Sequence, residues 1–182
     1  MEPVFRRSVS GKLSLADTNE AIAIRSENRG RDYTKALPAA VVRKRAEAAV
    51  RRMNGDLNNK IYLLGQFTIQ FRQFRNETFK WLVSNSLGYA AFIVVSSQND
   101  PASADERWVN KMALKNYLSL FPEGLEAINI KKLEKQGCQV PAKPSSKLVE
   151  AATDLMSDTD DNELSAMAEK VEFDLQAVDA EA

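Results

Sequence analysis

Residues 77–95 read Glu77-Thr-Phe-Lys-Trp-Leu-Val-Ser-Asn-Ser-Leu-Gly-Tyr-Ala-Ala-Phe-Ile-Val-Val95 and contain the longest apolar run of the chain. Phe79, Leu82 and Val83 have the spacing of one helical face, so the first half is expected to form a helix that stops at the glycine. The run 89–95 fits a buried helix or a buried strand, because periodicity does not separate the two at this length. We expect a helix, since the run follows a segment that ends as a glycine-capped helix does.

Two more helices are predicted downstream of this stretch. Residues 97–103 have the Asn, Asp, Pro and Ser of a loop, and a helix follows over residues 104–120. Pro122 interrupts the chain and starts the next helix, because proline is accepted in the first helical turn. Gly137 ends that helix.

Upstream, the polarity of residues 67–72 alternates. Phe67, Ile69 and Phe71 are apolar and the residues between them are polar. This period of two predicts a short, half-buried strand. Gly65 is expected to form a bulge in it or a turn between two short strands.

A basic amphipathic helix is predicted over residues 39–53, directly after Pro38. Asn54 and Gly55 follow it, and Gly55 is expected to take the left-handed conformation that ends a helix. The apolar stripe of this helix consists of Val42, Ala46, Ala49, Val50 and Met53. The basic part of its surface consists of Arg43, Lys44, Arg45, Arg51 and Arg52.

These elements predict an α+β, mainly helical fold with a short strand or hairpin. We expect a globular domain over residues 38–136, preceded by a flexible basic arm over residues 1–37. Residues 137–147 are rich in Pro and Ser and predict a linker. Residues 148–182 predict an acidic amphipathic helical tail, because apolar residues recur there at spacings of three and four between acidic ones.

The charge of the chain is balanced in total but uneven along its length. Among 182 residues there are 25 Lys and Arg and 25 Asp and Glu. Residues 1–53 carry a net charge of +6, residues 54–136 one of +2, and residues 137–182 one of −8. Such segregation is typical of a basic arm and an acidic tail that bind different partners or each other, or that are simply solvated.

The composition excludes several classes of protein. The chain has no His and one Cys, Cys138. It therefore has no imidazole base, no His metal ligand, no intramolecular disulfide and no Cys-rich zinc site. No apolar run reaches the length of a membrane span, and residues 1–7 lack the apolar region of a signal peptide. We expect an intracellular protein, either nuclear or cytoplasmic, that uses no membrane and no cofactor.

The central stretch contains Thr78-Phe79-Lys80-Trp81-Leu82 followed by Asn85-Ser-Leu-Gly88-Tyr89-Ala90. With these residues it resembles a small module found in uncharacterised, sometimes transposon-associated animal proteins. The module is written G-x-[FY]…TF-x-WL-x-x-N-x-GYA, and a related short segment follows the nuclease domain in exonuclease-X-like bacterial proteins. The match covers about residues 62–128, but between Gly65 and Thr78 this chain has a longer, Phe-rich segment. The resemblance implies a compact auxiliary module that works near nucleic-acid proteins, and no defined chemistry. The matching residues are Gly65, Phe67, Thr78, Phe79, Trp81, Leu82, Asn85, Gly88, Tyr89 and Ala90, followed by Asn110, Lys111, Leu114, Tyr117 and Phe121-Pro122-Glu123.

Two surfaces are candidate binding sites. The five basic residues of the 39–53 helix, Arg43, Lys44, Arg45, Arg51 and Arg52, have the charge to neutralise nucleic-acid phosphates, and the alternative is an ordinary solvated face. The tail stripe is a candidate site for a protein partner, and the alternative is a surface helix that packs back on the domain. This stripe consists of Leu164, Met167, Val171, Leu175 and Val178.

Two other groups of residues are interpreted as structural. The aromatic residues between Tyr62 and Phe92 alternate with cations as a stacking platform for single strands would, yet their spacing favours a core. The carboxylates show no strand-borne cluster for a metal ion, and helix capping accounts for several of them. These carboxylates are Glu77, Asp100, Asp105, Glu106, Glu123 and Glu126.

The sequence therefore favours a non-enzymatic accessory or interaction module. Its basic N-terminal segment is expected to contact nucleic-acid phosphate without sequence preference, and its acidic tail to bind a protein partner. The alternative is a structural or assembly protein whose basic and acidic ends mediate self-association. An enzyme is not expected, because no nucleophile or metal constellation is present.

Overall fold

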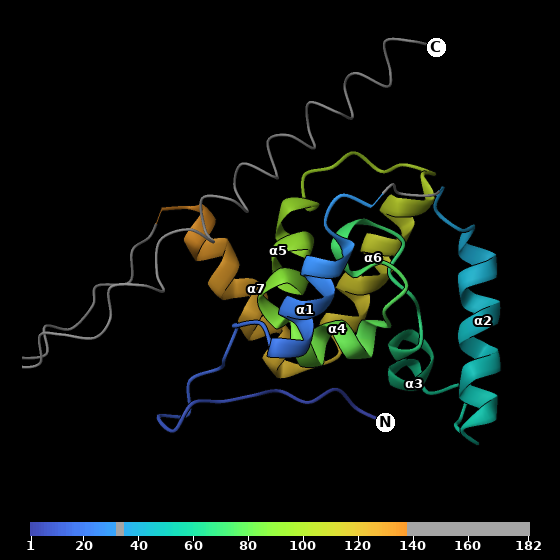
Figure 1. Cartoon of the computed structure of the whole chain (residues 1–182), viewed down its shortest axis with the longest axis horizontal. Coiled ribbons are helices and arrows are strands. Elements are labelled where there is room, and N and C mark those ends of the chain that lie inside the picture. Colours follow the sequence, from blue (N-terminus) through green and yellow to red (C-terminus); the bar gives the residue numbers. More distant parts are fainter. Residues whose placement is uncertain (32–34, 138–182) are drawn as a thin grey trace, which may run out of the picture. The chain divides into compact units, whose positions relative to one another are not determined.

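The computed structural model describes residues 1–31 and 35–137, and these residues belong to one compact unit. The predicted linker from residue 138 onward and the predicted tail lie outside the described residues. The described chain is mainly helical, as expected (Figure 1). Its elements are α1 (Asn19–Asn28), α2 (Ala39–Arg52), α3 (Lys60–Gly65), the short 3-10 helix η1 (Arg72–Phe74), α4 (Phe79–Asn85), α5 (Leu87–Ser96), α6 (Glu106–Leu118) and α7 (Pro122–Lys135).

Helix α5 forms the centre of the core and confirms the helical interpretation of residues 89–95. It packs against α4, α6 and α7, and Figure 1 shows it beside α7. A helix surrounded on several sides must be apolar around most of its circumference, which the uninterrupted apolar run provides. Its buried residues are Leu87, Gly88, Tyr89, Ala90, Ala91, Ile93, Val94 and Val95.

The predicted strand over residues 67–72 is wrong. Within the described residues this segment forms no strand: its bridge joins only Thr68 and Thr78, and η1 begins at Arg72. The alternation failed because Gln70 is as buried as Ile69, with 1% and 0% of their surfaces exposed. The backbone N–H of Ile69 donates to the Glu77 carbonyl oxygen at 2.9 Å, and that of Gln70 donates to Asn110 Oδ1 at 3.0 Å. The segment is therefore held partly by backbone hydrogen bonds to residues 76–79 and partly by a side-chain amide.

The segment predicted as a basic arm contains a helix. Helix α1 forms there, and its N-cap Thr18 accepts a hydrogen bond from the backbone N–H of Ala21 at 3.1 Å. Leu13 and Ala21 are buried, with 3% and 0% exposed. Upstream, the Phe5 ring lies 5.4 Å from that of Phe121 between centroids. The segment is thus held by apolar contacts with the helical core.

The residues just before α1 are hydrogen-bonded to the junction of α4 and α5. The backbone N–H of Thr18 donates to the carbonyl oxygen of Asn85 at 2.9 Å, and its hydroxyl donates to Asn85 Oδ1 at 3.1 Å. Ser86 Oγ donates to Asp17 Oδ1 at 2.5 Å. A Cβ on Gly88 would lie 2.5 Å from the Leu15 carbonyl oxygen, so only glycine allows this close approach.

Helix α2 forms over nearly the residues expected of it. It packs on α3 and α6 through Val42, Ala46 and Val50, which are 2%, 1% and 0% exposed. Met53, at the end of the predicted stripe, remains 42% exposed. Asn54, not Gly55, takes the left-handed conformation after the helix, with φ 51°.

Gly55 instead allows close packing, since a Cβ there would lie 2.9 Å from Val50 Cγ1.

In the part of the chain that the structure describes, no helix has the length and apolar character needed to cross a bilayer.

Candidate nucleic-acid interface

The five basic residues predicted as a binding site all lie on the exposed surface of α2. We call Arg43, Lys44, Arg45, Arg51 and Arg52 the basic surface of α2. Only Arg43 has a carboxylate partner within the described residues: its Nε lies 3.1 Å from Glu47 Oε1, one turn further along. The other four cations form no ion pair with any described residue.

The position of α2 keeps this surface open. Its apolar stripe is buried against α3 and α6, and Figure 1 shows it beside α3. The first turn is fixed to α6, because the backbone N–H of Ala39 donates to Glu106 Oε2 at 2.7 Å. Glu106 also places a negative charge at the N-terminus of α2, where the helix dipole favours it. The cations are therefore presented by a helix held on its opposite side and at its start.

Arg51 and Arg52 have a structural explanation as well. They lie in the last turn of α2, where cations interact favourably with the dipole. Lys44 and Arg45 lie in the middle of the helix, where this explanation does not apply. Those two residues are thus the more informative members of the basic surface.

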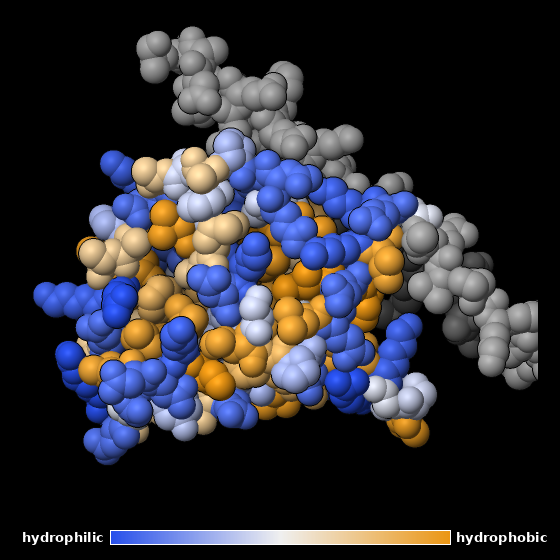
Figure 2. Space-filling view, turned by 180° about the vertical axis from the view of Figure 1, so that it is seen from behind, coloured by the Kyte–Doolittle hydropathy of each residue, from blue (hydrophilic) through white to orange (hydrophobic). Residues whose placement is uncertain are grey.

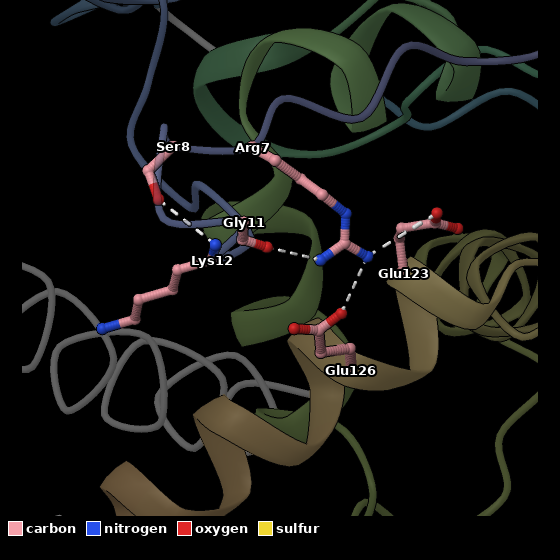
Figure 3. A network of polar contacts seen from close by, with 6 residues as sticks. All are labelled: Arg7, Ser8, Gly11, Lys12, Glu123 and Glu126. Atoms are coloured by element: carbon pink, nitrogen blue, oxygen red, sulfur yellow. Dashed lines mark hydrogen bonds and ion pairs between the residues drawn. The ribbon is translucent and has the colours of Figure 1, made fainter.

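The cations of the N-terminal segment are partly neutralised within the molecule. Arg7 Nη2 lies 3.2 Å from Glu126 Oε2 and 3.7 Å from Glu123 Oε1, both on α7 (Figure 3). Arg7 Nη1 also donates to the Gly11 carbonyl oxygen at 3.0 Å. Arg25 Nη1 lies 3.3 Å from Asp17 Oδ2. Arg7 and Arg25 are therefore less available to a polyanion than cations without a carboxylate partner.

The aromatic residues lie mostly in the core, which supports the structural interpretation over a stacking platform. Phe74 and Phe79 are fully buried, and Tyr89 is 8% exposed. Phe74 meets Tyr89 edge-on at 5.1 Å, and Phe79 lies 5.9 Å from Phe67. The half-buried Trp81 donates from Nε1 to Glu20 Oε1 at 2.8 Å, which joins α4 to α1.

The candidate carboxylates are spread over separate elements. Asp105 caps α6, accepting from the backbone N–H of Arg107 at 3.4 Å, and Asp100 Oδ2 lies 4.0 Å from Lys111 Nζ. Burial, reinforced by nearby Glu20, raises the pKa of Glu77. Among the described residues no three His, Cys, Asp or Glu side chains are grouped to hold a metal ion.

Sequence reasoning missed a buried amide network that joins three parts of the fold. Asn110 Nδ2 donates to the Thr68 carbonyl oxygen at 3.0 Å, and Gln70 Nε2 donates to Thr68 Oγ1 at 3.0 Å. Gln70 Oε1 accepts from the backbone N–H of Leu37 at 3.0 Å, just before α2. The network therefore ties the 67–71 loop to α6 and to the entry of α2. The only signal in the sequence was the position of Asn110 in the downstream part of the resembled module.

Two titratable groups of α6 have shifted pKa values, which the sequence did not predict. Burial lowers the pKa of Lys111, with smaller lowering effects of Arg72 and Arg107, and Asp100 and Asp105 oppose the shift. Burial, with a smaller contribution from Glu2, raises the pKa of Tyr117.

An apolar area lies on the face shown in Figure 2, bordered by hydrophilic residues. Several large apolar side chains of the described chain are partly exposed. They include Leu120, Leu125 and Leu133, which are 38%, 47% and 45% exposed.

The predicted partner site and the lone cysteine lie outside the described residues. These are Leu164, Met167, Val171, Leu175 and Val178 of the tail stripe, and Cys138. Comparison with protein-family models, curated proteins and solved structures finds no match for this chain. The resemblance of residues 62–128 to the small module therefore stays a prediction.

Proposed function

We propose that this chain is a non-enzymatic accessory module that contacts nucleic-acid phosphate through the basic surface of α2. The observation that supports this most is the exposure of Lys44, Arg45, Arg51 and Arg52 with no carboxylate partner among the described residues. A cation already paired with a carboxylate must give up that pair before it binds phosphate. These four have no such pair to give up within the described part of the chain.

Binding by these residues is expected to be independent of sequence and sensitive to salt. Lysine and arginine that neutralise phosphates release condensed counterions, and added salt opposes this release. The helix also holds the cations on one rigid element, which limits the ordering required on binding.

A mobility-shift experiment at ~50 mM salt, where phosphate contacts are strong, tests the proposal. The full chain should shift mixed-sequence DNA or RNA, and the variant Lys44→Gln, Arg45→Gln, Arg51→Gln, Arg52→Gln should not. A matched control changes four exposed cations elsewhere, Lys12, Arg107, Lys115 and Lys135, to Gln. It loses the same formal charge and should retain most of the binding. Absence of any shift by the unaltered chain would overturn the proposal, as would equal loss in both variants.

The acidic tail is proposed to recruit a protein partner. Its stripe of Leu164, Met167, Val171, Leu175 and Val178 is bordered by acidic residues, as in segments that dock on a partner. Pull-down from nuclease-treated extract, with the full chain and with Leu164→Asp, Val171→Asp, tests this role. A protein retained by the full chain after nuclease treatment and lost by the variant supports direct recruitment. Capture that disappears with the nuclease indicates bridging by nucleic acid instead.

Self-association is the second candidate, because basic and acidic residues are segregated along the chain, with +6 at the start and −8 at the end. It predicts assemblies that dissociate as salt is added, since screening weakens exposed charge pairs. Sedimentation at low and high ionic strength distinguishes the two functions. A strict monomer under both conditions excludes self-association and leaves the binding proposal intact.

A further inference from the structure

The cations on the outward face of α2 are arranged in two rows along the helix. Successive residues of a helix are about 100° apart around the axis, so residues seven apart lie almost in line. Lys44 and Arg51 therefore form one row, and Arg45 and Arg52 form a second row about 100° around the helix. Within each row the two residues are about 10 Å apart along the axis.

A ridge of small apolar residues separates the two rows. Val41 and Ala48 lie between them around the helix, and both are exposed. The ridge points nearly away from the buried stripe of Val42, Ala46 and Val50. The face directed to solvent is thus a short ridge with a pair of cations on each side.

This arrangement fits the major groove of B-form DNA. That groove is about 12 Å wide and admits an α-helix, whose diameter with side chains is about 10–12 Å. A helix in the groove has a phosphate backbone on each side and base edges in front. The two cation rows would face the two backbones, and the small ridge would allow the helix to come close to the base edges.

The same face is poorly suited to the other forms of nucleic acid. Single strands bind on exposed aromatic rings, and α2 has no aromatic residue. A-form RNA has a deep, narrow major groove that side chains do not enter. The ridge residues Val41 and Ala48 also lack hydrogen-bonding side chains, so they offer no polar readout of bases.

We propose that the nucleic acid bound by the basic surface of α2 is duplex DNA, with α2 in the major groove and its two cation rows on opposite phosphate backbones. This inference rests on the proposed function and specifies its substrate class. Binding is independent of base sequence, because the cations contact phosphates and the ridge is apolar.

The test compares four probes of equal length and mixed sequence with the full chain at ~50 mM salt, by fluorescence anisotropy. The probes are duplex DNA, its single strand, duplex RNA, and duplex DNA with bulky groups on C5 of its pyrimidines, which project into the major groove. We expect the full chain to bind the plain DNA duplex about tenfold or more tightly than each of the other probes.

Two double variants test whether α2 lies between the two phosphate backbones of the duplex. Lys44→Gln, Arg51→Gln and Arg45→Gln, Arg52→Gln each remove one row, and each should weaken duplex binding by a similar factor. Unequal loss confined to one row would overturn the inference, because it places α2 along a single backbone. Equal affinity for all four probes would overturn it too, while leaving phosphate binding in place. Failure to bind any probe would instead remove the proposed function on which it rests.

Discussion

At the scale of single residues, close backbone contacts explain positions that hydrophobic periodicity does not. Gly88 lies at the start of the central helix α5, directly beneath the Leu15 carbonyl oxygen. Any added side-chain carbon must displace that backbone, and the backbone is held nearby by the hydrogen bonds of Thr18 to Asn85. Because it has no Cβ, Gly88 allows the backbone of the N-terminal segment to pack directly against α5.

We expect Gly88→Ala to lower the free energy of unfolding by about 1–3 kcal/mol, the usual cost of overpacking. Urea denaturation of the full chain measures this change. The double variant Gly88→Ala, Leu15→Ala serves as the control. It should recover little of the loss, because the nearest atom is a backbone oxygen and not the Leu15 side chain. Full recovery would show that the contact with the carbonyl oxygen is not limiting.

Glu77 makes stability depend on pH. Burial, with a smaller effect of Glu20, raises its pKa in the folded state above the ordinary 4.5. The folded state then holds the proton more tightly than the unfolded state, so this contribution is complete below pH 4.5 and is lost as pH rises through the folded pKa. Glu77→Gln should therefore be more stable than the natural chain at neutral pH, with no advantage in acid. An advantage that grows in acid would contradict this sign.

Asn54 and Gly55 show how far sequence reasoning reaches at this scale. The end of α2 was predicted correctly from the pair, but the residue with positive φ was not. Both asparagine and glycine adopt the left-handed conformation, and only the packing of Gly55 against Val50 decides between them. A contact between residues of different elements is not visible in local sequence.

At the scale of elements, the amide network around Asn110 anchors the 67–71 loop, where the polarity pattern predicts a strand. Its side chain accepts from the Gln70 N–H and donates to the Thr68 carbonyl oxygen. Both partners lie in or beside the core, where an unpaired polar group is costly. The network therefore fixes the loop together with the backbone hydrogen bonds of Ile69 to Asn76 and Glu77.

Asn110→Ala should lower the free energy of unfolding by about 1–3 kcal/mol, because the buried Gln70 N–H loses its partner and the Thr68 carbonyl oxygen keeps only the bond from Gln70 Nε2 at 3.3 Å. Chemical denaturation followed by tryptophan fluorescence measures this loss. Asn116→Ala is the matched control on the exposed side of α6 and should change stability by less than about 0.5 kcal/mol. Similar values for both variants would mean that the network contributes little.

Most helices were predictable because each buries one stripe or is buried all round. Helix α2 shows the first case and α5 the second. The bulge or turn expected at Gly65 is wrong, because Gly65 is the last residue of helix α3. Helix α1 was not predicted as an element, since Ala21 is its one buried residue and Ile22 beside it is 47% exposed. It is held by its ends and by the Trp81–Glu20 hydrogen bond, and none of these contacts produces an apolar period.

At the scale of the whole molecule, the N-terminal segment tests whether apolar burial or charge pairing holds the chain together. Leu13 is 3% exposed, whereas the Arg7, Glu123 and Glu126 side chains of the ion-pair cluster are 42%, 29% and 40% exposed. Exposed ion pairs stabilise little, and buried leucines stabilise strongly.

Leu13→Ala should therefore destabilise the fold by about 2–5 kcal/mol, and Arg7→Gln by less than about 1 kcal/mol. Thermal unfolding of the two variants at the same ionic strength gives the comparison. A larger effect of Arg7→Gln would mean that the ion pairs anchor the segment.

The candidate site was predictable in composition but not in detail. The sequence placed five cations on one helix, and the structure exposes them. Which cations already have partners depends on tertiary contacts, such as those of Arg7 with α7 and Arg25 with Asp17. The outward face of α2 remains the candidate site, because it gathers four cations without a described carboxylate partner on one helix.

The salt dependence of duplex DNA binding tests the central claim most directly. A plot of log affinity against log salt has a slope of about −0.9 for each phosphate neutralised. If Lys44, Arg45, Arg51 and Arg52 each contact a phosphate, changing all four to Gln should make the slope shallower by about 3 to 4. The matched control at Lys12, Arg107, Lys115 and Lys135 should leave it nearly unchanged. An identical slope for the natural chain and the α2 variant would contradict the assignment of the basic surface of α2.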